Sequence, residues 1–319
     1  METVYISHPH QIKKDDLKPT VMALGFFDGV HLGHQQVITT AKTIAKNKGY
    51  NCSVMTFNPH PKEVLRAKRG SEQMPYLTPI KDKARQIEQL DVDRLYIVQF
   101  SKEFASLTPQ QFVDEYLIRL HVKHVVAGFD YTYGNLGKGT METLPFHSRN
   151  EFEQTTVHKV EESERKISST LIRELIKNGE VADVPAYLGR YYQISGTVIH
   201  GDKRGRTIGF PTANIEFTDR YLSPSTGVYA VSMQVDGKSY EGVCNVGYKP
   251  TFYEDSQQAT IEVHLFDFER SIYGAEVTLQ WLTYIRGERK FNSVDELTKQ
   301  ISKDKEEAIA FFHQQKVKE

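Results

Sequence analysis

The first half of the chain alternates short apolar runs with segments in which apolar residues recur at helical spacing. The runs predict strands at Thr20–Phe27, Cys52–Phe57, Leu95–Phe100 and Val122–Phe129. The spaced segments predict helices at His34–Lys48, Ile80–Leu90, Pro109–Leu120 and Ser168–Lys177. Because helices separate the strands, the pattern predicts βαβ crossovers and a mostly parallel, doubly wound, Rossmann-like sheet.

The pattern changes after about Leu188, where short runs rich in Val, Ile, Thr, Tyr and Phe follow one another. They predict six strands, at Tyr192–His200, Thr212–Phe217, Val228–Val235, Tyr240–Val246, Thr260–Phe268 and Glu276–Ile285. Asp236-Gly237 between two runs indicates a two-residue hairpin. We therefore expect an antiparallel β-barrel, closed by a C-terminal helix at Ser293–His313. The predicted domains are residues 1–183 and 184–319.

Composition agrees with two ordinary globular domains, since the chain has 319 residues and 25% charged residues. A net charge of −1 disfavours a nucleic-acid partner, because phosphate contacts need a basic surplus. No stretch has the roughly 20 apolar residues of a membrane span, and Met1–Lys18 lacks the apolar core of a signal peptide. Cys52 and Cys244 each lie inside an apolar run, which favours buried, reduced thiols and a cytoplasmic location. The oligomeric state stays open.

The segment between the first strand and the first helix carries the strongest chemical signal. It reads Gly25-Phe26-Phe27-Asp28-Gly29-Val30-His31-Leu32-Gly33-His34. His31 and His34 can project from one side of the first helical turn, and Gly33 lets a phosphate approach the backbone. Two imidazoles beside free helix amides suit an anionic phosphoryl-transfer transition state. A zinc site is the alternative, but Asp28 is the one further ligand that the local sequence offers.

Three further segments of the first domain fall at strand ends or helix starts. Asn58-Pro59-His60 follows the second strand, and Gly128-Phe129-Asp130 follows a later one, where open α/β sheets bind ligands. Ser168, Ser169 and Thr170 begin a helix, so their hydroxyls can cap it and face phosphate oxygens. Arg173 lies one turn further on and can clamp phosphates.

The second domain contains a glycine-rich and arginine-containing turn. Its residues include Gly201, Gly205, Arg206, Gly209 and Pro211. Backbone amides and guanidinium groups in such a turn can form a phosphate cradle. Thr212 and Asn214 alternate on the predicted strand that follows, so their side chains share a face. Their oxygens are hard donors that suit Mg²⁺ bound with ATP phosphates.

These motifs together resemble known families. Gly25–His34 with Ile167–Arg173 is similar to the signature of the nucleotidyltransferase superfamily, and Phe57–Pro61 with Gly128–Gly134 is similar to its flavin-nucleotide adenylyltransferase branch. The resemblance implies that His31, His34 and Arg173 stabilise the transferred nucleotidyl group. It implies ATP binding by Gly25, Phe26, Phe27, Asp28, Gly33, Ser168, Ser169 and Thr170, and flavin binding by Asn58, Pro59, His60, Gly128, Phe129 and Asp130. Tyr131 and Tyr133 depart from the family, which usually has Phe at both positions.

The second half resembles the riboflavin kinase family through Gly201–Asn214, Asn245–Gly247 and Ile261–Phe268. In that family the segment Gly201–Asn214 binds ATP, which implies that Thr212 and Asn214 hold Mg²⁺-ATP. The resemblance also implies that Glu262 is the general base, since a carboxylate can accept the proton of a weakly nucleophilic hydroxyl. Asp267 falls on the opposite strand face by parity, which disfavours it as the base.

Over residues 20 to 312 the chain therefore resembles the bacterial bifunctional riboflavin kinase/FMN adenylyltransferase (FAD synthetase) family. This implies ATP-dependent phosphorylation of riboflavin to FMN by the second domain, and adenylylation of FMN by ATP to FAD and pyrophosphate by the first. Two alternatives remain at this stage. One is a nucleotidyltransferase for another phosphorylated acceptor, and the other is a flavin-binding regulator without catalysis.

Overall fold

A computed structural model describes residues 1–65, 74–159, 161–162, 165–201, 205, 208–248 and 259–318. The chain divides into two compact units, Met1–Ser169 and Thr170–Glu319, and each is described by itself. The boundary between residues 183 and 184 stays a prediction.

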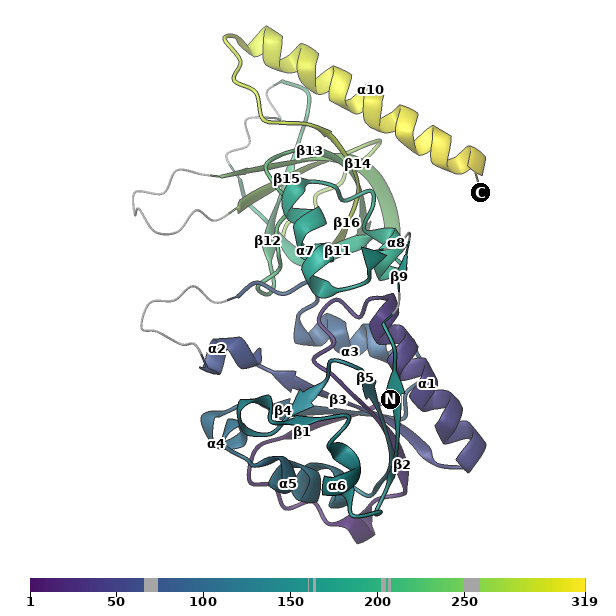
Figure 1. Cartoon of the computed structure of the whole chain (residues 1–319). Coiled ribbons are helices and arrows are strands. Elements are labelled where there is room, and N and C mark those ends of the chain that lie inside the picture. The colour runs from purple at the N-terminus through teal and green to yellow at the C-terminus, as the bar shows by residue number, and fades with distance from the viewer. Residues whose placement is uncertain are drawn as a thin grey trace. The chain divides into compact units, whose positions relative to one another are not determined.

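The first unit is built on a six-stranded sheet in the order β1-β4-β3-β2-β5-β8 (Figure 1). The strands are β1 (Glu2–Ile6), β2 (Thr20–Leu24), β3 (Asn51–Asn58), β4 (Arg94–Gln99), β5 (Val122–Gly128) and β8 (Glu153–Val157). All neighbouring strands are parallel, which confirms the predicted sheet. The chain runs outward from β2 to β3 and β4 and then returns to β5 on the other side of β2. The topological switch point therefore lies between β2 and β5, where such sheets bind ligands.

Helices cover both faces of this sheet because successive strand residues point to opposite sides. On one face Val21 and Ala23 pack with Ile38 of α1 (Leu32–Lys48) and Ile87 of α3 (Ile80–Glu88). On the other face Met22 and Leu24 belong to a cluster with side chains of four helical segments. These are α4 (Lys102–Ala105), α5 (Pro109–Phe112), the π-helical segment η2 (Val113–Ile118) and α6 (Leu144–Ser148).

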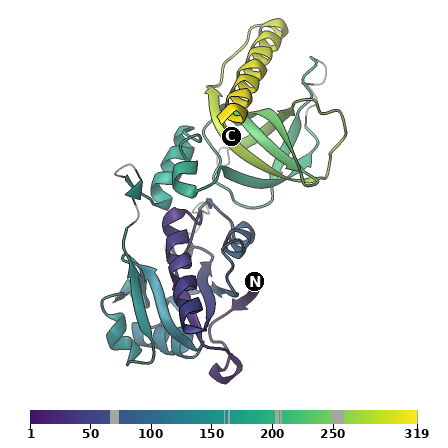
Figure 2. The same ribbon diagram turned by 90° about the vertical axis from the view of Figure 1, so that its right-hand side faces the viewer.

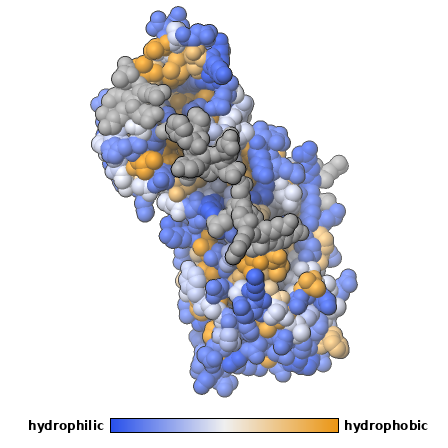
Figure 3. All heavy atoms as spheres, turned by 90° about the vertical axis from the view of Figure 1, so that its left-hand side faces the viewer, coloured by the Kyte–Doolittle hydropathy of each residue, from blue (hydrophilic) through white to orange (hydrophobic). Residues whose placement is uncertain are grey.

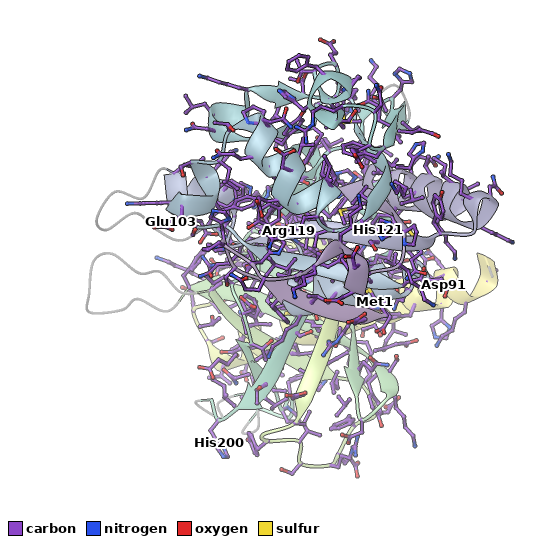
Figure 4. All side chains as sticks on the ribbon, turned by 90° about the horizontal axis from the view of Figure 1, so that it is seen from below. Met1, Asp91, Glu103, Arg119, His121 and His200 are labelled. Atoms are coloured by element: carbon purple, nitrogen blue, oxygen red, sulfur yellow. The ribbon has the colours of Figure 1, made fainter. Side chains whose placement is uncertain are left out.

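The predicted helix Pro109–Leu120 is one α-helical turn that continues as a π-helix. Thr108 and Gln111 form a capping box at its start, and the Arg119 amide donates to the Asp114 carbonyl at 3.0 Å, five residues back. The wider turn is followed by Arg119 and His121, which are labelled in Figure 4. The Arg119 guanidinium donates to the Ile12 carbonyl at 3.0 Å, and Nδ1 of His121 lies 2.7 Å from the Leu17 carbonyl. These contacts hold the segment between β1 and β2.

The first unit also contains the short elements η1 (Lys14–Asp16), α2 (Pro61–Leu65), β6 (Thr132–Tyr133), η3 (Asn135–Gly137), β7 (Gly139–Thr140), β9 (Glu161–Glu162) and β10 (Arg165–Lys166).

The second unit is a closed barrel in the order β11-β12-β15-β14-β13-β16, as predicted. Its strands are β11 (Tyr192–Ile199), β12 (Ala213–Phe217), β13 (Gly227–Val235), β14 (Lys238–Tyr248), β15 (Ala259–Leu265) and β16 (Glu276–Arg286), preceded by α7 (Ser169–Asn178) and α8 (Pro185–Leu188). Asp236 and Gly237 have φ of 48° and 76° and join paired residues Val235 and Lys238, so the predicted hairpin is confirmed. The side chain of Trp281 is fully buried and lies edge-on to Tyr229, with 5.2 Å between the ring centroids.

Helix α10 (Val294–Lys318) lies along the outside of the barrel (Figure 2). Ala308 and Phe312 pack on Val228, Val243 and other barrel residues. A bidentate ion pair fixes the helix further, because Arg286 Nε and Nη2 donate to the two Asp304 carboxylate oxygens at 2.8 and 2.7 Å. The predicted C-terminal helix is confirmed and extends beyond His313.

Hydrophilic residues cover most of the described surface on the face in Figure 3, with hydrophobic residues in patches between them. Across the ranges that the structure describes, no helix is both long and apolar enough to cross a membrane.

Asp304→Ala is expected to destabilise the second unit by about 2–3 kcal/mol, because it leaves the Arg286 charge partly buried without its carboxylate. Trp281 is the one tryptophan of the chain and lies inside the barrel, so urea unfolding followed by its fluorescence reports on this unit. Glu307→Ala is the matched control, since Glu307 pairs with Lys303 on the exposed side of the same helix, and should change the free energy of unfolding by at most about 1 kcal/mol. Equal effects of the two substitutions would contradict this assignment.

Candidate active sites

Three predicted motifs of the first unit follow the carboxyl ends of three adjacent parallel strands, at the same end of the sheet. Gly25–His31 follows β2, Asn58–His60 ends β3, and Gly128–Asp130 ends β5. The first two are in contact, because the Gly25 amide donates to the Met55 carbonyl at 3.3 Å and the rings of Phe26 and His60 lie 4.3 Å apart. This end of the sheet includes the switch point between β2 and β5.

The loop between β2 and α1 is tightly turned. Phe27, Gly29 and Val30 have φ of 55°, 89° and 43°. Positive φ is unfavourable for an aromatic residue and more so for a β-branched one, at about 1–3 kcal/mol each. Phe27 and Val30 are both buried in the apolar cluster beneath the loop. The strained turn is thus held by packing, and it delivers His31 to the helix N-terminus.

His31 and His34 form a stacked pair at the start of α1. Their ring centroids are 3.5 Å apart and their planes differ by 16°. Nδ1 of His31 accepts a hydrogen bond from the His34 amide at 3.2 Å, so His31 caps the helix, and its neutral ring carries the hydrogen on Nε2. The sequence predicted the shared side of the helix, and the structure adds the stacking and the cap.

The His34 ring is held in its neutral form. Burial, the neighbouring His31 and the Lys83 ammonium lower the pKa of His34 well below its ordinary value. Its ring stands edge-on to Phe27, at 5.2 Å between centroids. Among the residues that the structure describes, no group hydrogen-bonds to its buried Nδ1. A neutral imidazole here can donate or accept a hydrogen bond without bringing a competing proton equilibrium at neutral pH.

Asp28 anchors the loop. Its carboxylate oxygen Oδ1 accepts hydrogen bonds from the amides of Leu77 and Thr78, both at 3.1 Å, and its side chain is buried. Its carbonyl accepts a hydrogen bond from the Ser169 hydroxyl at 2.8 Å. Asp28 therefore ties the loop to two distant segments, and direct ATP binding by this residue stays a prediction. No group of three or more potential metal ligands of the His, Cys, Asp and Glu types occurs within the described ranges.

The loop between β2 and α1, Gly25–His31, is called the histidine loop. Part of the predicted helix-start motif reaches it. A Cβ on Gly33 would lie 3.9 Å from the Ile167 carbonyl, and Ser169 bonds to Asp28 as described. Thr170 and Arg173 belong to the second compact unit. Their role at the histidine loop stays a prediction.

The predicted flavin-binding residues occupy two of the three loops. The His60 amide donates to the Tyr76 hydroxyl at 3.0 Å, which positions the loop after β3. Phe129 is 46% exposed, and the Lys166 ammonium lies 4.8 Å above its ring and 3.0 Å from the Asp130 carboxylate. An exposed aromatic ring at the edge of the sheet can stack on another planar ring.

Tyr133, one of the two departures from the family pattern, is explained by a hydrogen bond. Its ring is buried and its hydroxyl lies 2.8 Å from Nδ1 of His147. Tyr131 stacks beside it, at 6.3 Å between ring centroids. Burial, with a smaller effect of Tyr133, raises the pKa of Tyr131, so its hydroxyl stays protonated. The additional oxygen of Tyr133 is thus accommodated inside the unit.

In the barrel, three polar residues stand opposite one another on adjacent strands. Glu262 of β15 pairs in register with Asn214 of β12 on one side and with Asn245 of β14 on the other. Directly opposed side chains have Cβ atoms about 4.5–5.5 Å apart. The neighbouring residues Cys244 and Val263 are buried, so this row faces away from the barrel interior. Sequence reasoning noted the Asn245–Gly247 motif but assigned Asn245 no role.

The glycine-rich turn leaves room for this row. A Cβ on Gly201 would collide with the side-chain amide of Asn214, and one on Gly205 would collide with the Phe210 carbonyl and lie 3.6 Å from the Thr212 hydroxyl. The two glycines therefore let the Asn214 side chain and the Phe210 carbonyl pack directly against the backbone of the turn. Arg206 lies outside the described residues.

Two details of the predicted strands are corrected. β12 begins at Ala213, so Thr212 precedes the strand and its alternation with Asn214 is not a strand property. β15 ends at Leu265 and Asp267 has a φ of 50° in the turn that follows, so strand parity says nothing about Asp267. The Pro211 carbonyl beside Thr212 lies 2.9 Å from Nδ1 of the buried His264.

A doubly wound sheet with paired histidines at its switch point, joined to a closed barrel with a carboxylate between two asparagines, defines a nucleotidyltransferase fused to a kinase-type barrel. A family model described as FAD synthetase matches residues 13–171, and one described as riboflavin kinase matches residues 188–312. The chain belongs to the family of bifunctional riboflavin kinase/FMN adenylyltransferases.

Relatives with that description cover almost the whole chain. The Bacillus subtilis (strain 168) protein is 55% identical, covering 98% of this chain and 98% of its own length. The Escherichia coli (strain K12) protein is 35% identical, covering 95% of this chain and 96% of its own length. A solved structure described as a macrolide-efflux protein from Streptococcus pneumoniae superposes with a TM-score of 0.87 at 38% identity, covering 96% of this chain and 98% of that one.

His34→Gln is expected to flatten the pH dependence of stability. Because the pKa of His34 is lowered on folding, the unfolded chain binds a proton that the folded chain does not, and stability is lost as the pH falls below the ordinary value of 6.5. The loss approaches about 1.4 kcal/mol per pH unit for one such group. Urea unfolding followed by circular dichroism at pH 7.5 and 5.5 measures this loss of stability. Trp281 fluorescence follows the unfolding of the barrel separately. The same pH dependence in both proteins would contradict a neutral His34 in the folded protein.

Proposed function

We propose that the chain carries out two successive ATP-dependent reactions, with an independent site for each. The barrel unit phosphorylates riboflavin to FMN, and the first unit joins FMN to the adenylyl group of ATP, forming FAD and releasing pyrophosphate. The observation that supports this best is the position of the described motif residues in each unit. The histidine pair lies at the switch point of the sheet, and Glu262 lies in register between Asn214 and Asn245.

In the kinase reaction, the Glu262 carboxylate accepts the proton of the ribityl 5′-hydroxyl as that oxygen attacks the γ-phosphorus of ATP, and ADP leaves. Thr212 and Asn214 would hold Mg²⁺ through the hydroxyl and the amide oxygen, which are hard oxygen donors of the kind that Mg²⁺ prefers. Bound there, Mg²⁺ supplies charge neutralisation for the ATP phosphates. Glu262 lies on a strand that pairs on each side, which fixes the backbone from which its carboxylate projects.

In the adenylyltransferase reaction, an FMN phosphate oxygen attacks the α-phosphorus of ATP and pyrophosphate leaves. The nucleophile is already anionic, so this site needs no general base. Nε2–H of His31 and the first amides of α1 can donate hydrogen bonds to phosphate oxygens, and the helix N-terminus favours negative charge. Phe129 offers an exposed ring for the flavin, and the family resemblance assigns Arg173 to the same reaction.

His31→Asn is expected to lower the rate of FAD formation by about 10²- to 10³-fold and to leave FMN formation unchanged. Asn caps helices well, so this variant removes the imidazole while it keeps an acceptor for the His34 amide. The measurement is chromatographic separation of FMN and FAD after incubation with riboflavin, ATP and Mg²⁺. Wild-type rates of FAD formation would exclude His31 from the reaction.

Glu262→Gln should have the reverse effect. Loss of the base lowers FMN formation from riboflavin by about 10²- to 10⁴-fold, whereas FAD formation from supplied FMN keeps its wild-type rate. The isosteric amide preserves the strand pairing, so a change in folding is not expected. If either His31→Asn or Glu262→Gln abolished both activities in a folded protein, two independent sites would be the wrong description.

A further inference from the structure

Lys83 is a buried lysine of the first unit. It lies in the first turn of α3, and its side chain is 1% exposed. Burying an ammonium group is costly unless a charged or hydrogen-bonding partner compensates it. Within the described ranges, no carboxylate lies within ion-pairing distance of its Nζ, and the adjacent Asp82 pairs with Arg85 instead.

The ammonium group is compensated by the backbone of the histidine loop. Nζ donates to the Phe26 carbonyl at 2.7 Å and to the Thr56 hydroxyl at 3.3 Å, and it lies 4.1 Å from the centroid of the Phe26 ring. The Thr56 hydroxyl also donates to the Phe26 carbonyl, at 2.8 Å. The Phe26 ring also contacts the His60 ring, so α3, β3 and both motif loops converge on this residue.

These contacts bear on the strained part of the chain. Phe26 immediately precedes Phe27, the first of the positive-φ residues that lead to His31. A hydrogen bond from a charged donor is worth about 1.5–3 kcal/mol, comparable to the strain at one such residue. Lys83 is therefore placed to hold the loop in the conformation that presents the histidine pair.

We propose that Lys83 is a positioning residue of the adenylyltransferase site, which holds the Phe26 carbonyl and contributes a buried positive charge beside the histidine pair. The proposal rests on the adenylyltransferase function proposed above. Lys83 acts through the loop conformation and through the electric field of its ammonium group, without contacting the substrate.

The charge of Lys83 is itself sensitive to pH. Burial lowers the pKa of Lys83 to about 8, and the nearby Asp28 carboxylate opposes this shift. The groups that act on the neighbouring His34 are His31 and Lys83. Because the protonated form is the one that donates and carries charge, the contribution of Lys83 is present below about pH 8 and is lost as the pH rises through that value.

The test compares Lys83→Met and Lys83→Arg with Lys81→Met in the full-length chain. Lys81 is exposed two residues away on the same helix, so its substitution is the matched control. We expect Lys83→Met to lower kcat/KM for FAD formation from FMN and ATP by about 10- to 100-fold at pH 7, with FMN formation by the barrel unchanged. Lys81→Met should behave as wild type.

A pH profile distinguishes this role from a merely structural one. Wild-type kcat/KM should fall as the pH rises through about 8. Lys83→Met should lack this decline, and Lys83→Arg should recover part of the activity at pH 7 and keep it above pH 9, because a guanidinium stays charged. Nuclear magnetic resonance of the His34 ring should also show a higher pKa in Lys83→Met than in the wild type.

Three results would overturn the proposal. The first is FAD formation by Lys83→Met within twofold of wild type, and the second is persistence of the decline near pH 8 in both variants. The third is an unchanged His34 titration in Lys83→Met. If Lys83→Met fails to fold, the profiles of the wild type and Lys83→Arg decide. A wild-type protein that makes no FAD at any pH would instead contradict the proposed function, while the His34 titration would still test the effect of Lys83.

Discussion

The first unit depends on a single sharp turn between a buried strand and a helix. Leu24 ends β2 and Leu32 begins α1, and the loop between them includes Phe27 and Val30 at positive φ. Three kinds of contact stabilise this conformation: apolar burial of the two side chains, amide hydrogen bonds to the Asp28 carboxylate, and the ammonium beneath Phe26. Strain of this kind persists only where the surroundings over-determine the backbone, and it is concentrated at functional sites.

The sequence pattern predicted the central strands and the whole barrel, but it missed β1 and β8. Both lie at edges of the sheet and carry weak signals: β1 buries Ile6 fully and leaves Glu2 and Thr3 exposed, and β8 reads Glu-Gln-Thr-Thr-Val. A central parallel strand such as β2 is buried at all five positions, so its sequence is a continuous apolar run. Barrel strands were easier because one face of each fills the interior and turn residues such as Asp236-Gly237 separate them.

The candidate site residues that lie within continuous sequence motifs could be found from the sequence. His31, His34 and Gly33 lie in one motif, and Glu262 lies in another. Lys83 and Thr56 could not be found in this way, because a lysine on an amphipathic helix ordinarily faces solvent and burial of its ammonium depends on a loop 57 residues away. Asp28 was found from the motif, and the structure adds that its carboxylate accepts hydrogen bonds from two backbone amides.

The two sites differ in construction in the way that their reactions require. Proton transfer from a hydroxyl needs a base at hydrogen-bond distance, and Glu262 is held on a strand that pairs on both sides. Adenylyl transfer to a phosphate needs no base but requires several donors around spreading negative charge, which a helix N-terminus, a loop and a buried cation can supply together. A carboxylate base beside the histidine pair would oppose that charge. In the proposed scheme, separate folds therefore let one chain with a net charge of −1 provide a carboxylate base for one step and hydrogen-bond donors with a buried cation for the other.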